Sequence, residues 1–96
     1  MQYDKFTIIE RISILNGRIE ELEREHAERD ITITDLRGRL NIATQNKHTV
    51  KAEEHSVSLT RALYEQKEIE QVIRLLIAER EELAKPGFGS ADSQPA

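Results

Sequence analysis

Apolar residues recur at alternating steps of four and three between Ile8 and Val50, and this spacing restricts the fold more than any other feature of the chain. It is the a/d pattern of a heptad repeat, which gathers one apolar stripe along a helix and requires a second helix to cover that stripe. The strongest part runs from Ile12 to Leu22, with isoleucine at the a positions and leucine at the d positions. The pattern predicts an all-α protein built from long heptad-patterned coiled-coil helices.

The composition suits such a seam better than a globular core. The chain has 96 residues, of which 33% are charged and only 4% are aromatic. Charges of both signs are interleaved and sum to −4, so the sequence indicates no strong footprint for nucleic acid and no affinity for a membrane. There is no cysteine, no apolar run of about 18 residues and no signal-peptide pattern. We expect a protein made in a cytosol, either cytoplasmic or part of a virion or other assembly.

A second seam lies between Leu59 and Leu83, and its phase is shifted by two residues from the first. Neither a single stutter nor a single stammer produces this shift. An antiparallel hairpin explains it, because residues whose numbers sum to 95, such as Leu22 and Ile73, then face each other. The alternative is one continuous helix of about 120 Å in a parallel coiled coil, since no glycine or proline lies between Arg39 and Lys85.

We favour the hairpin, which also avoids stacking His26 and Arg29 on their own copies in a parallel dimer. Residues 1–6 are then a lead-in, 7–45 helix one, 46–49 the turn and 50–85 helix two. Thr7 and Glu10 have the spacing of a capping box at the start of helix one. Pro86 ends helix two, and residues 86–96 form a small, polar tail that we expect to be disordered.

Helix two is apolar over more than a stripe, and a face that wide needs two or more neighbours. We therefore expect the hairpin to dimerise into a four-helix bundle, or a bundle of three or more long helices to form, or a partner protein to dock on Leu75 and Ile77. The expected partners are thus a second copy of the chain and another protein. Three polar residues at seam positions, His26, Arg29 and Gln66, form a register-setting layer in which Arg29 faces Gln66. The apolar interface positions are Ile12, Leu15, Ile19, Leu22, Ile33, Leu36, Leu40, Leu59, Leu63, Ile69, Val72, Ile73, Leu76, Ile77 and Leu83.

The sequence predicts no catalytic, cofactor or metal site, and hence no enzyme. The only histidines are His26, His48 and His55. We interpret them as forming neither the Glu-x-x-His motif of a carboxylate di-metal bundle nor a His-Glu-x-x-His zinc motif, and the chain has no glycine-rich phosphate loop. His48 and His55 are seven residues apart and could share a metal only between chains. The carboxylates have the spacing of exposed helix surfaces, which gives no reason for acid–base chemistry.

One segment has a limited likeness to a known family. Residues 18–36, RIEELEREHAERDITITDL, resemble the first coiled-coil part of the small bacterial SlyX-like proteins, notably in ELE and ITI. The activity of that family is not established, so the resemblance implies no function for this chain.

Together these features predict a non-enzymatic structural or adaptor protein. It would act by forming a dimer or higher oligomer and by protein–protein interaction within a larger assembly, such as a viral or bacterial one. A first alternative is a small helical inhibitor or regulator that docks on a partner protein and blocks it. A second, less favoured alternative is a nucleic-acid-associated regulator that acts through Arg37, Arg39, Lys47, His48 and Lys51.

Overall fold

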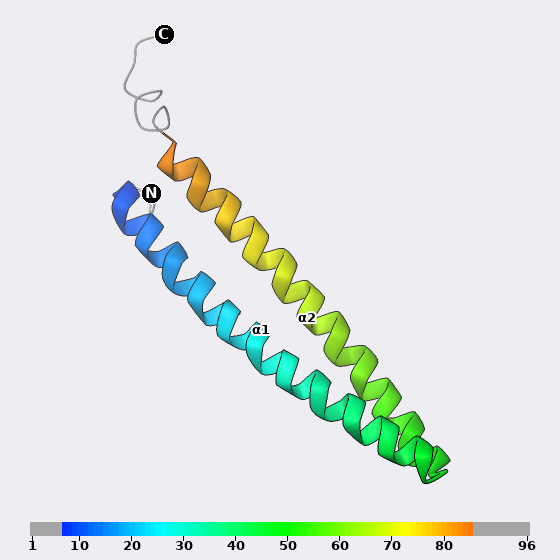
Figure 1. The fold of residues 1–96 in the computed structure, drawn as a ribbon. Coiled ribbons are helices and arrows are strands. Elements are labelled where there is room, and N and C mark those ends of the chain that lie inside the picture. Colours follow the sequence, from blue (N-terminus) through cyan, green and yellow to red (C-terminus); the bar gives the residue numbers. More distant parts are fainter. Residues whose placement is uncertain (1–6, 86–96) are drawn as a thin grey trace.

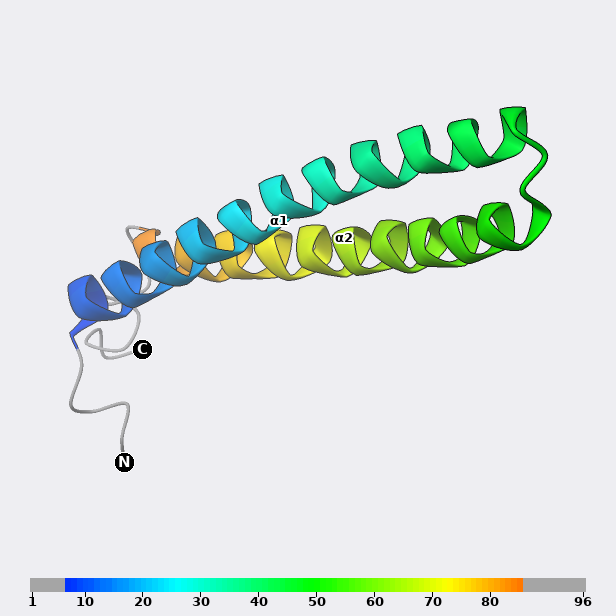
Figure 2. The ribbon, with the colours of Figure 1, turned by 90° about the horizontal axis from the view of Figure 1, so that it is seen from below.

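The computed structural model describes residues 7–85 and shows two long α-helices folded back on each other (Figure 1). α1 spans Ile8–Gln45 and α2 spans Thr49–Ala84. The two helices run antiparallel, so the start of α1 and the end of α2 lie at the same end of the molecule (Figures 1 and 2). The predicted all-α hairpin is confirmed, and the continuous helix is excluded. The lead-in at 1–6 and the tail at 86–96 fall outside the described residues.

The first helix begins at the predicted capping box. The backbone N–H of Thr7 donates to Glu10 Oε1 at 2.9 Å, and the backbone N–H of Glu10 donates to Thr7 Oγ1 at 3.1 Å. These two reciprocal bonds satisfy donors that have no partner within the helix. The same contacts lower the pKa of the Glu10 carboxyl, chiefly through the backbone bond from Thr7.

The chain reverses over residues 46–48, one residue fewer than the sequence suggested. Lys47 has φ 59°, a left-handed conformation that non-glycine residues adopt at a cost. Its N–H donates to Thr44 O at 3.1 Å, and the His48 N–H donates to Ala43 O at 2.8 Å. This pair of bonds is the Schellman ending of a helix, with lysine at the position that glycine usually occupies. α2 then starts at Thr49 without a side-chain cap.

The contacts between α1 and α2 show which residues of the two helices lie opposite each other. His26 contacts Glu70, Asn16 contacts Arg80 and Asp30 contacts Gln66. The residue numbers of each pair sum to within one of the predicted value, so the two seams meet as the phase shift required.

Replacing Thr7 by Ala should destabilise the protein by about 1 kcal/mol, because the first turn of α1 loses its cap. Thr60→Ala is the matched control, since Thr60 bonds only to Ser56 O within α2 and should change stability little.

The contribution of Glu10 to the stability of the protein depends on pH, and the sign of this dependence follows from the capping contacts. Because folding lowers the pKa of Glu10, its contribution is present above the ordinary value of 4.5 and is lost as the pH falls through the folded pKa. Urea unfolding of Glu10→Gln and wild type should therefore differ at pH 7 and converge in acid; a constant difference would contradict the capping account.

Lys47→Gly should stabilise the hairpin by about 1 kcal/mol, because glycine adopts the left-handed conformation without the Cβ clash. The same replacement at the exposed helical residue Lys51 should destabilise it by a similar amount. Urea unfolding followed by circular dichroism measures both. Equal signs for the two variants would show that the turn is not held in the conformation described.

Candidate association surface

The apolar seam between the helices is only partly covered. Within residues 7–85, six apolar side chains are buried: Ile19, Leu22, Ile33 and Ala43 on α1, and Ala62 and Leu83 on α2. No side chain in the described residues is less than 2% exposed. Nine other predicted interface residues lie along the seam or beside it but stay half-exposed: Ile12, Leu15, Leu36, Leu40, Leu59, Ile69, Ile73, Leu76 and Ile77. The last two, Leu63 and Val72, are more exposed, at 39% and 40%.

This half-covered state follows from the geometry of two helices. Each helix can shield only the side of its partner that it contacts, and the flanks of both stripes remain open to water. Buried positions therefore occur where a seam residue points directly at the opposite helix, whereas the other seam residues, such as Leu36 and Ile73, keep one side open to water. A third or fourth helix is needed to cover the rest.

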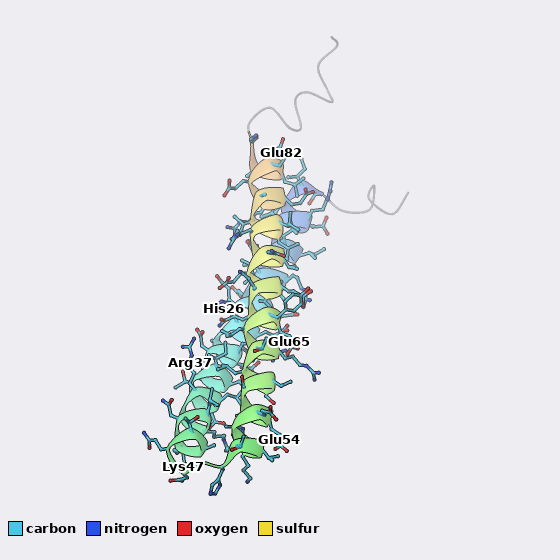
Figure 3. All side chains as sticks on the ribbon, turned by 90° about the vertical axis from the view of Figure 1, so that its right-hand side faces the viewer. His26, Arg37, Lys47, Glu54, Glu65 and Glu82 are labelled. Atoms are coloured by element: carbon cyan, nitrogen blue, oxygen red, sulfur yellow. The ribbon has the colours of Figure 1, made fainter. Side chains whose placement is uncertain are left out.

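The polar layer lies midway along the hairpin, where Figure 3 shows His26 and Glu65 on the two helices. Nε2 of His26 lies 2.9 Å from Glu70 Oε2, and Nη2 of Arg29 lies 3.4 Å from Glu65 Oε2. The side-chain amide of Gln66 donates to Asp30 Oδ1.

The sequence predicted that Arg29 faces Gln66, and the structure shows that each of these side chains contacts a carboxylate of the opposite helix. Arg29 instead contacts a glutamate, and Gln66 an aspartate, because carboxylates flanking the seam reach into the layer. Asp30, Glu65 and Glu70 were the residues that sequence reasoning missed, although their positions beside the seam in the antiparallel register could have indicated them. Arg29 Nε is buried without a hydrogen-bond partner in the described part of the chain. Since an unsatisfied buried donor costs stability, we infer that the layer serves mainly to fix the register.

The two edges of the hairpin differ in polarity. Along one edge, which we name the polar edge, side chains bond across the seam: Arg80 Nη1 donates to Asn16 Oδ1 at 2.8 Å, followed by the His26–Glu70 and Asp30–Gln66 contacts. On α2, Ile77 lies between Glu70 and Arg80, and Leu63 lies beyond Gln66 on the same edge.

The opposite edge is bridged by two ion pairs, Arg11–Glu79 at 3.9 Å and Arg29–Glu65 at 3.4 Å. Between Glu65 and Glu79, α2 presents four apolar residues on this edge, each three or four residues from Val72, and we name this set the open edge: Ile69, Val72, Leu75 and Leu76. Leu75, which the sequence indicated as a docking position outside the predicted interface set, is 69% exposed.

A small cavity of about 290 Å³ opens on the polar edge and is lined by Glu23, His26, Glu70, Ile73 and Arg74. Glu23 and His26 have the Glu-x-x-His spacing found in carboxylate-bridged metal bundles. The interpretation that the sequence holds no such motif was therefore wrong. Within residues 7–85, however, no group of three or more histidine, cysteine or carboxylate side chains is placed to hold a metal ion.

The residues considered for nucleic-acid binding gather at the turn end, where Figure 3 shows Lys47. Arg39, His48, Lys51 and His55 line a cavity of about 250 Å³. Arg39 is already bonded to Asp35 at 2.8 Å, so the surface available to a phosphate is small.

Comparison of the chain with protein-family models, with curated proteins and with solved structures gives no match. Neither helix within residues 7–85 has the length and apolar character needed to cross a membrane. The functional proposal therefore depends on the geometry of the hairpin.

Leu22→Ala should destabilise the protein by about 2 to 4 kcal/mol, because Leu22 is 4% exposed at the centre of the seam. Ile9→Ala is the matched control, since Ile9 is 80% exposed and its truncation should change the free energy of unfolding by less than about 0.5 kcal/mol. Thermal and urea unfolding would compare them. Equal losses in the two variants would contradict the placement of the seam.

Proposed function

We propose that this protein works by self-association, as a non-enzymatic coiled-coil subunit that builds or supports a larger assembly. The half-covered seam carries the proposal. Nine apolar side chains of the predicted interface line the contact between the helices and yet remain half-exposed, which leaves apolar surface that a second hairpin can cover. We further propose that the assembly forms in a cytosol, in keeping with the cysteine-free, mixed-charge composition.

Energetics supports association over a monomeric role. The hairpin of residues 7–85 buries six apolar side chains, which is a small core for two long helices. The free energy gained from this burial has to offset the conformational entropy that both helices lose on folding. Packing two hairpins into a four-helix bundle buries the flanks of both stripes without changing either helix. Folding and association would then be coupled, and stability would depend on protein concentration.

A second candidate is the docking of the hairpin on a different protein as an inhibitor or adaptor. The exposed Leu75 favours it, since a large apolar side chain that is 69% exposed suits a helical partner. The two candidate functions predict different oligomeric states for the purified protein. Self-association yields a homo-oligomer, whereas a dedicated adaptor is a monomer until its partner is added.

Sedimentation equilibrium of the full chain should give at least twice the 11.1 kDa chain mass, and the unfolding midpoint should rise with protein concentration. Ile73→Ala should lower both the oligomer fraction and the midpoint, because half-exposed Ile73 becomes buried on assembly. Ile31→Ala is the control, since Ile31 is 72% exposed on the outer face. A stable, cooperatively folded monomer at concentrations near 1 mM, where an affinity of about 4 kcal/mol would already show, would contradict self-association.

A further inference from the structure

We propose that the outer face of α2 binds α2 of a second copy of this chain in antiparallel orientation, about a two-fold axis near Val57. This face points away from α1, so the contact is separate from the half-exposed seam. The inference deepens the proposed self-association and rests on it, because a hairpin with two separate contacts can link copies into a larger assembly.

Three exposed apolar residues form a stripe on this face. Val50, Val57 and Tyr64 lie seven residues apart and are 69%, 65% and 66% exposed, and we name them the outer stripe. Residues at this spacing share one side of a helix in a coiled coil. Within residues 7–85, no two of the exposed isoleucines of α1 have this spacing; they are Ile9, Ile14, Ile31 and Ile42. The outer stripe thus differs from the scattered apolar residues that any surface carries.

The outer stripe is symmetric about its middle residue. In an antiparallel pair of copies with an axis near Val57, this residue faces its own copy, and Val50 of each copy faces Tyr64 of the other. A small apolar side chain then meets a large one at both ends of the contact. Tyrosine is enriched at protein interfaces because its ring contributes apolar area while its hydroxyl stays at the hydrated rim.

The charges beside the outer stripe fit the same axis. Glu54 and Arg61 are exposed and lie seven residues apart on one flank of the stripe. Neither takes part in an ion pair in the described part of the chain, and seven residues is too far for them to pair along one helix. A two-fold axis sets the same flank of both copies side by side. Glu54 of each copy then lies within one residue of the level of Arg61 in the other, which gives two identical ion pairs.

The rest of the contact brings no uncompensated like charges together. On the other flank, Glu53 lies near the level of Thr60 in the second copy. At the ends of the contact, Lys47 reaches the level of Lys67 and Glu68, which are neighbours of opposite charge. The favourable pairs therefore decide the electrostatic balance.

A parallel pair of copies has the opposite balance. It would set Glu54 and Arg61 against their own copies. It would also bring together the two turn ends, because residues 36–52 hold four lysine or arginine residues and no acidic residue. In the antiparallel pair, the two turns lie roughly 27 Å apart, the rise of about 18 helical residues, which exceeds the screening length of about 10 Å in 0.1 M salt.

The contact is short, with three apolar layers over about five turns of α2. A contact of this size is weak between two isolated copies. It gains strength where several hairpins are already held together, because the second contact then forms at a high effective concentration. Covalent trapping is therefore the suitable measurement.

Disulfide trapping tests the axis directly, because the chain has no cysteine. In full-length Val57→Cys the two substituted positions face each other, so mild oxidation should convert most of the protein to a covalent dimer. Val50→Cys is the matched control, since it changes a valine of the same stripe whose two copies lie roughly 21 Å apart along the helices. It should cross-link at least about 10-fold more slowly. A mixture of Val50→Cys and Tyr64→Cys should form the mixed disulfide.

Charge reversal tests the orientation independently. In the Val57→Cys background, Arg61→Glu should slow cross-linking about 10-fold, because two attractive pairs become repulsive. Adding Glu54→Arg should restore the rate. Arg24→Glu is the control for net charge, because Arg24 is exposed on α1, and it should leave the rate unchanged.

Fast cross-linking at Val57 that the double reversal restores supports the contact. Equal rates for Val50→Cys and Val57→Cys, or a rate that Arg61→Glu leaves unchanged, overturn it. If Val57→Cys does not cross-link while the oligomer is still weakened by Ile73→Ala, the outer-stripe contact is overturned and self-association through the seam stands. A monomeric wild-type protein overturns both.

Discussion

Everything in this hairpin depends on the packing of two amphipathic stripes, each of which the other covers only in part. The stripes are long, and their central residues, Ile19 and Leu22 on α1 and Ala62 on α2, are buried. Their flanks are not, because two cylinders in contact cannot shield more than the facing side of each other. The two helices thus form a complete hairpin, but the apolar core between them is only partly shielded from water. This exposed apolar surface is the main support for the proposed function.

The polar residues at the seam determine on which edge of the hairpin apolar surface stays exposed. Each polar residue of the layer contacts a carboxylate beside the seam on the opposite helix: His26 contacts Glu70, Arg29 contacts Glu65 and Gln66 contacts Asp30. These contacts link the two stripes in one register. Most of them lie on one edge. The other edge keeps a run of apolar residues between two ion pairs, Arg11–Glu79 and Arg29–Glu65. The two edges of the hairpin therefore differ in polarity.

Much of the fold could be predicted from the sequence because helices with a sustained heptad pattern are determined locally. The shift in phase between the seams indicated a reversal, and the spacing of Thr7 and Glu10 indicated the helix start. The turn was harder to place, since Lys47 occupies a left-handed position where glycine would have signalled the helix end. The acidic partners of Arg29 and Gln66 were missed because the seam pattern alone leaves out the carboxylates beside it, which the antiparallel register brings to these residues. Leu75 was already a predicted docking position, but the polarity of the edge on which it lies is defined only after the register pairs the two helices.

The most direct test of the account is the distance within one chain between the middles of the two helices. Nitroxide labels on Arg24→Cys and Gln71→Cys, both exposed, can be measured by pulsed electron spin resonance in the presence of excess unlabelled protein, so that only intrachain pairs contribute. The hairpin predicts a separation of roughly 20 to 35 Å, from an interaxial distance of 8 to 10 Å plus the two label arms. A separation near 70 Å, the rise of 47 residues along one helix at about 1.5 Å each, would contradict the hairpin and every surface derived from it.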